Sequence, residues 1–140
     1  MALVMIFGHE KRDVKVFDVP GAYLHTDLPG DKFALMKFEG QFVDIMCDVN
    51  PEYKEDVRYE NGKKVLYVQI LKAIYGMIES ALLWYNLYWS VLEMEGFKLN
   101  PYDKCVANKI VNGKQATIAW YVDDNMLAHV DPEVTNSIVA

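Results

Sequence analysis

Alternation of apolar and polar residues predicts several short strands separated by tight turns. In Val14–Val19 apolar positions alternate with polar ones, and Pro20-Gly21 then ends the segment. Lys32–Phe38 has the composition of a further strand before Gly40. Two Asn-Gly pairs, at 61–62 and 112–113, each join two strand-like segments. Both central positions of a type I′ turn need positive φ, which Asn-Gly tolerates, so hairpins are expected over 57–70 and 105–120.

Apolar residues recur at helical spacing between Ser80, a suitable N-cap, and Gly96, a suitable stop. This stripe is rich in aromatic residues, and its i, i+3, i+4 spacing favours a core face over a platform for stacking bases. It consists of Trp84, Leu87, Tyr88, Val91 and Leu92. Residues 1–12 are expected to form the end of a helix, and another helix should begin after Asp131-Pro132.

The segment 44–60 carries six acidic residues against Lys54 and Arg58. Acids clustered in sequence usually face water, so we expect a solvated loop with a short helix after Asn50-Pro51. An acidic metal site is the alternative. The order of elements (helix, strand, hairpin, long helix, three antiparallel strands) predicts an α+β fold with helices on one face of the sheet.

Composition adds limits to this picture. With 140 residues and 52% hydrophobic side chains, residues 1–140 are expected to form one domain with a real core. Fourteen Lys and Arg against twenty Asp and Glu give a net charge of −6, which is the wrong sign for a stand-alone nucleic-acid binder. The N-terminus lacks the pattern of a signal peptide, and no apolar run reaches the roughly 20 residues of a membrane span. Two cysteines favour a reducing, intracellular compartment.

The candidate chemistry lies at Tyr121-Val122-Asp123-Asp124, between strand-like segments 114–120 and 125–130. The pattern places two adjacent carboxylates in a tight hairpin turn, and carboxylate oxygens are ligands that Mg²⁺ prefers. A two-metal site needs a further acid from elsewhere, and Asp18 at the end of its strand is the candidate. The alternative is an ordinary acidic turn, where Asp is common.

These residues belong to ordered blocks that cover about residues 14 to 130. The blocks are Asp18–Leu28, Leu71–Gly76, Trp84-Tyr85, Gly96-Phe97, Tyr102–Val106 and Tyr121–Asp124. In this order they resemble the reverse transcriptase domain of Ty1/copia-type retrotransposons. The resemblance implies a polymerase palm with part of the fingers, and an RNA-directed DNA polymerase activity. It also implies that the thumb and RNase H regions lie outside residues 1–140.

The resemblance further implies a role for individual residues. Asp18 and Asp123 would be the principal ligands of two Mg²⁺ (or Mn²⁺) ions, with Asp124 as the third carboxylate and the Val19 carbonyl as a possible helper. Tyr23 would lie under the deoxyribose and exclude a 2′-hydroxyl, unless it is a core tyrosine. Lys72 would reach a phosphate or else face solvent. The primer would be contacted by Tyr121 and Val122.

One block departs from the family. Where the family has Leu-Lys-Gln-Ala-Pro-Arg, this chain has Met77–Leu82, without positive charge at Ile78, Glu79 or Leu82. The implied partners are an RNA or DNA template-primer, a deoxynucleoside triphosphate and the rest of a polyprotein, within a cytoplasmic particle or the nucleus. Two alternatives stay open: a non-catalytic remnant of a retroelement, and an unrelated metal-dependent nucleotidyl transferase with a palm.

Overall fold

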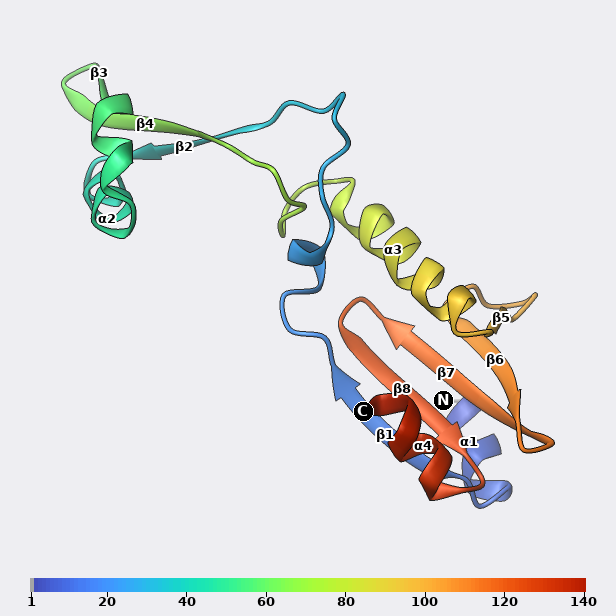
Figure 1. Cartoon of the computed structure of the whole chain (residues 1–140). Helices are drawn as coiled ribbons and strands as arrows, with labels where there is room; N and C mark the ends of the chain where they lie inside the picture. The colour runs from blue at the N-terminus through green and yellow to red at the C-terminus, as the bar shows by residue number, and fades with distance from the viewer. Residues whose placement is uncertain (1) are drawn as a thin grey trace. The chain divides into compact units, whose positions relative to one another are not determined.

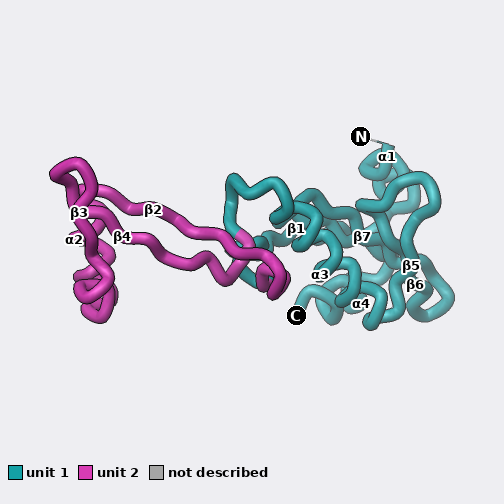
Figure 2. Tube along the Cα trace, turned by 90° about the horizontal axis from the view of Figure 1, so that it is seen from above, with its two compact units in different colours: residues 1–26, 74–140 teal, residues 27–73 magenta. Residues whose placement is uncertain are grey.

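The computed structural model describes residues 2–140, which form two compact units (Figure 2). Unit 1 contains the residues up to Thr26 and those from Ile74 onward, whereas unit 2 is Asp27–Ala73. Each unit combines antiparallel strands with helices, which confirms the predicted α+β class. No helix within residues 2–140 has both the length and the apolar character needed to cross a membrane.

The sheet of unit 1 has five antiparallel strands (Figure 1). Their order across the sheet is β1 (Asp13–Asp18), β8 (Asp124–His129), β7 (Lys114–Tyr121), β6 (Val106–Val111) and β5 (Lys98–Leu99). The β6–β7 hairpin turns at Asn112 and Gly113, whose φ angles are 51° and 73°. Both angles are positive, so the expected turn is confirmed.

Helices α3 (Ser80–Met94) and α4 (Pro132–Val139) cover one face of this sheet. Leu92 of α3 packs with Ile118, Trp120 and Leu127 of β7 and β8 in the main core cluster. Tyr85, Tyr88 and Trp89 contact the same cluster. The aromatic stripe of α3 is therefore mainly a core face, as its spacing predicts.

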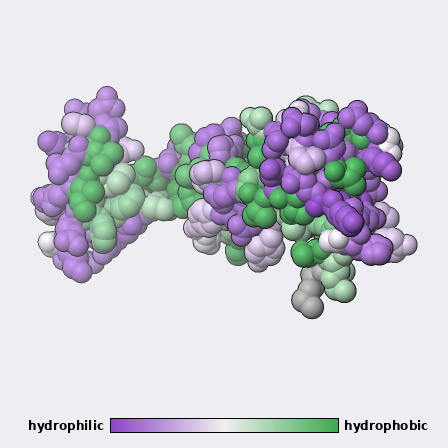
Figure 3. Space-filling model, turned by 90° about the horizontal axis from the view of Figure 1, so that it is seen from below, coloured by the Kyte–Doolittle hydropathy of each residue, from purple (hydrophilic) through white to green (hydrophobic). Residues whose placement is uncertain are grey.

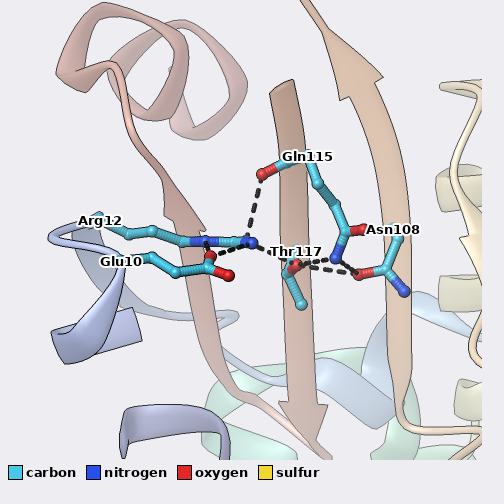
Figure 4. A network of polar contacts seen from close by, with 5 residues as sticks. All are labelled: Glu10, Arg12, Asn108, Gln115 and Thr117. Atoms are coloured by element: carbon cyan, nitrogen blue, oxygen red, sulfur yellow. Dashed lines mark hydrogen bonds and ion pairs between the residues drawn. The ribbon is translucent and has the colours of Figure 1, made fainter. Parts of the chain in front are cut away.

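The segment that follows α1 (Ala2–His9) contacts the opposite face of the sheet. Arg12, whose side chain is only 8% exposed, donates to the Thr117 hydroxyl at 3.0 Å and to the Gln115 carbonyl at 3.1 Å (Figure 4). It also forms an ion pair with Glu10 at 2.6 Å. The predicted helix over 1–12 thus ends at His9, with Met1 outside the described residues. Within residues 2–140, α3 and α4 lie on one common face of the unit 1 sheet, as predicted for its helices.

Unit 2 is built on a three-stranded antiparallel sheet in the order β2 (Leu35–Glu39), β4 (Lys63–Gln69) and β3 (Arg58–Glu60). The β3–β4 hairpin turns at Asn61-Gly62 with φ angles of 50° and 77°, as expected. Helix α2 (Gln41–Val49) packs Val43 and Cys47 against Leu66. The core of this unit is therefore small.

Several elements differ from the sequence-based expectation. Residues 44–49, about a third of 44–60, belong to α2 rather than to a loop, because Val43 and Cys47 are buried on one helix face while the neighbouring Asp44 and Asp48 are exposed. A 3₁₀ helix does follow Asn50, over Pro51–Asp56. Strand β2 begins at Leu35, not at Lys32, and both β5 and the 3₁₀ turn η1 (Ala22–His25) were not predicted.

The acidic residues of 44–60 are all exposed, as expected for a solvated segment. Hydrophobic side chains are also exposed on both units, and Figure 3 shows them between hydrophilic residues on one face. Phe42, Ile45 and Val49 are examples on α2, and Val16 on β1 is 76% exposed.

Candidate functional site

The carboxylates of the candidate site lie at one end of the sheet of unit 1. Tyr121 pairs with Asp124 at the last position of the β7–β8 ladder, which leaves Val122 and Asp123 as the two residues of the turn. Asp124 is the first residue of β8 and is exposed, while Asp123 is half-buried. The expected tight turn is present, but Asp124 begins β8 and only Asp123 of the two carboxylates lies within the turn.

Strand β1 brings Asp18 to the same place. Asp18 and Asp124 are direct partners in the antiparallel β1–β8 register, so their side chains project from the same face. Tyr121, the partner of Asp124 on β7, extends the same row and is 78% exposed. The Val19 amide donates to the Asp123 carbonyl at 3.0 Å. Residues far apart in the sequence thus come together. Val19 contributes its N–H to this contact, whereas the resemblance implies a role for its carbonyl.

The side chains of Asp18, Asp123 and Asp124 are suitable ligands for a divalent cation. All three are carboxylates, and Mg²⁺ and Mn²⁺ prefer oxygen ligands. Like charges directly opposite one another destabilise a sheet, and a cation between Asp18 and Asp124 would relieve that repulsion. As the side chains lie, no group of three or more His, Cys, Asp or Glu within residues 2–140 has the arrangement of a metal site.

Two tyrosines border the turn. The Tyr75 hydroxyl donates to Asp123 Oδ2 at 3.4 Å, and the Tyr23 and Tyr75 rings lie 4.5 Å apart between centroids. Desolvation, together with the charge of Asp123, raises the pKa of Tyr75 above its usual value. Tyr23 stands on η1, immediately after the strand that carries Asp18. Tyr75 was not singled out from the sequence, although it stands in one of the blocks that carry the family resemblance.

Helix α3 supports the turn from the covered side of the sheet. The Trp84 indole Nε1–H donates to the Val122 carbonyl at 2.7 Å. Asn125 Nδ2 donates to the Asp123 carbonyl at 2.6 Å, and the Tyr88 hydroxyl donates to Asn125 Oδ1. Burial raises the pKa of Tyr88 to about 12. The helical spacing of Trp84 and Tyr88 and the position of Asn125 after the Asp pair are the signals in the sequence that bear on these roles.

Lys72 belongs to unit 2, where its ammonium forms an ion pair with Asp27 at 2.6 Å. That pairing supplies a local partner for a lysine that the resemblance assigns to a phosphate. In the block that departs from the family, Ile78 is 97% exposed and Leu82 is 62% exposed. Apolar side chains therefore face solvent where Ty1/copia-type reverse transcriptases, which the sequence resembles, have basic or polar ones.

Comparisons with family models, with curated proteins and with solved structures gave no match for this chain. The residues of the site and the sequence blocks that accompany them are therefore the features that indicate a function.

Proposed function

We propose that unit 1 is the palm, and unit 2 part of the fingers, of a Ty1/copia-type RNA-directed DNA polymerase. The observation that carries the proposal is the register of β1 and β8, which places Asp18 opposite Asp124 and next to the turn residue Asp123. An acidic hairpin turn alone would need no third carboxylate from a distant strand. The ordered sequence blocks around these residues add to the proposal.

In this proposal Asp18, Asp123 and Asp124 hold two Mg²⁺ or Mn²⁺ ions. When bound, such ions lower the pKa of an attacking hydroxyl and neutralise the charge of a triphosphate. The chain's own contribution is then to place these charges and the substrate, because phosphoryl transfer is catalysed mainly by positioning and electrostatic stabilisation. Tyr121 and Val122, at the exposed end of the hairpin, would contact the primer strand.

Tyr23 is proposed to select the sugar. It is half-buried on η1, and its ring contacts that of Tyr75, which in turn contacts Asp123. A tyrosine held in this way beside the carboxylates would lie under a deoxyribose and clash with a 2′-hydroxyl. For Lys72 to contact a phosphate, that phosphate would have to replace Asp27 as its partner.

The test is Mn²⁺ binding to the 140-residue chain, measured by electron paramagnetic resonance of free Mn²⁺. Asp18→Asn and Asp123→Asn should each weaken binding at least 10-fold, because each removes a proposed ligand. The matched control is Asp48→Asn, which neutralises an exposed acid in the acidic segment of unit 2. Binding that survives both site substitutions but falls in the control would refute the proposed site.

A non-catalytic remnant of a retroelement is the second candidate, favoured by exposed Ile78 and Leu82 and by the net charge of −6. Loss of charge-assisted phosphate contacts weakens nucleotide affinity rather than metal affinity. Calorimetric titration with dTTP in the presence of Mn²⁺ separates the two. A remnant would bind Mn²⁺ without dTTP, whereas a functional palm would bind both and would prefer dTTP to UTP. Tyr23→Ala should reduce that preference.

A further inference from the structure

The backbone of the carboxylate turn has an unusual conformation. Val122 has a φ angle of 56°, a region that strongly favours glycine, and Val is β-branched. It occupies the first of the two turn positions between paired Tyr121 and Asp124. Non-glycine residues keep such a conformation only when surrounding contacts determine it. The contacts of the turn therefore need to account for its shape.

The carbonyl groups of both turn residues are held by buried side chains. The Trp84 indole N–H donates to the Val122 carbonyl at 2.7 Å, and the Asn125 amide donates to the Asp123 carbonyl at 2.6 Å. Trp84 is 5% exposed and Asn125 is 2% exposed. Because successive residues of a strand point to opposite faces, the Asn125 side chain points to the face that α3 covers, while Asp124 projects from the other face.

The two donors are linked through α3. Trp84 and Tyr88 stand one helical turn apart, and their rings are stacked with centroids 5.3 Å apart. The Tyr88 hydroxyl donates to Asn125 Oδ1, which leaves the Asn125 amide N–H₂ free to face the Asp123 carbonyl. One face of one helix thus fixes both peptide groups of the turn.

We infer that Trp84, with Asn125 and Tyr88, is a positioning residue that fixes the turn so that Asp123 and Asp124 are held where they bind a divalent cation. This inference rests on the proposed metal function of the turn. The ring of Trp84 would pack in the core whether or not the turn has a function, so its N–H is the group to be tested. Partners that orient metal ligands typically contribute about 10- to 100-fold to metal affinity.

The experiment compares Trp84→Phe with Trp89→Phe. Both changes replace a tryptophan of α3 by a smaller aromatic residue, but only the first removes a donor to the turn. Trp84→Phe should weaken Mn²⁺ binding by about 10-fold relative to Trp89→Phe. Thermal melts of both variants in EDTA check that each is folded at the temperature of the binding measurement. Equal Mn²⁺ affinity in the two variants would overturn the inference.

A metal-free measurement separates this inference from the proposed function. In ¹⁵N-labelled chain with EDTA, Trp84→Phe should shift the amide signals of 122–125 and speed exchange of the Val19 amide, which donates to the Asp123 carbonyl. Trp89→Phe should leave both unchanged. If the wild-type chain binds no Mn²⁺, the proposed function fails, and these signals alone decide whether Trp84 sets the turn; unchanged signals refute that role.

A second pair of variants covers the case in which Trp84→Phe does not fold. Tyr88→Phe removes only the hydroxyl that orients Asn125, and Tyr85→Phe removes a hydroxyl that donates instead to the Lys104 carbonyl. Tyr88→Phe should reduce Mn²⁺ affinity and shift the Asp123 and Asp124 amide signals more than Tyr85→Phe does. The reverse order would contradict the positioning role.

Discussion

Asp18 and Asp124 are direct cross-strand partners at the terminal pair of β1 and β8, so two carboxylates project side by side from one face of the sheet. In the absence of a cation this pair lowers the stability of the sheet, because like charges directly opposite each other are destabilising. A cation-binding site would require close carboxylates of this kind beside the turn that carries Asp123.

Asp18→Asn should therefore stabilise the metal-free protein. Removing one of two facing charges is expected to raise the free energy of unfolding by about 0.2–1 kcal/mol in EDTA. If the proposed site binds Mn²⁺, the order should reverse in its presence, because tighter binding would stabilise the wild type more than the variant. Thermal melts with and without Mn²⁺ measure both effects. A variant that is less stable in EDTA and keeps the full Mn²⁺ shift would show that Asp18 has another role.

Tyr88→Phe should destabilise the protein in a pH-dependent way. At neutral pH it leaves Asn125 Oδ1 buried without its donor, at a cost of about 1–3 kcal/mol. Burial raises the pKa of Tyr88 to about 12 from 10.0. A raised folded-state pKa means that the contribution of Tyr88 to stability is fully present below pH 10 and falls as pH rises toward 12, and only the wild type has this contribution. The difference between the two proteins should shrink over that range.

Urea denaturation at pH 8, 10 and 11 measures this difference, and ultraviolet absorbance follows ionisation of the tyrosines. Tyr102→Phe is the control, because Tyr102 is 97% exposed. A constant difference between wild type and Tyr88→Phe across these pH values would mean that the hydroxyl is not desolvated.

The two units should unfold at different denaturant concentrations. Unit 2 has a small core around Val43, Cys47 and Leu66, and small cores supply little stability. Trp84, Trp89 and Trp120 are the tryptophans of the chain and all belong to unit 1, so fluorescence reports that unit. Buried Cys47 reports unit 2 by thiol labelling in a Cys105→Ser background, because Cys105 is exposed. We expect Cys47 to become reactive below the fluorescence midpoint; coincident transitions would indicate one cooperative domain.

The 140-residue chain should not extend a primer at a measurable rate. Positioning of reactants is worth about 7–11 kcal/mol of a barrier. The resemblance implies that the thumb, which would hold the duplex, lies outside residues 1–140. Loss of two or three phosphate contacts at about 1.5–3 kcal/mol each would weaken substrate binding further. Primer extension on poly(rA) with Mn²⁺ at low salt, beside Asp123→Asn, provides the measurement. Extension that this substitution abolishes would show that residues 1–140 suffice for catalysis.

Local patterns in the sequence predicted much of the fold. The two Asn-Gly turns, the α3 stripe and the strands around the Asp pair follow from turn chemistry and periodicity, which act over a few neighbouring residues. The same local rules missed α2, because its acidic residues were interpreted as a solvated segment although Val43 and Cys47 recur at helical spacing. They missed β5 because two residues carry too little pattern.

The composition of the candidate site came from the sequence, and its geometry came from the tertiary structure. Asp18, Asp123 and Asp124 could be selected as residues, since their strands and turn are locally encoded. Their juxtaposition depends on the β1–β8 register, which long-range packing sets. The contacts of Trp84, Tyr88 and Asn125 with the turn depend on where α3 lies against the sheet. Periodicity indicates which face of a helix is buried, but not which carbonyl its indole N–H will meet.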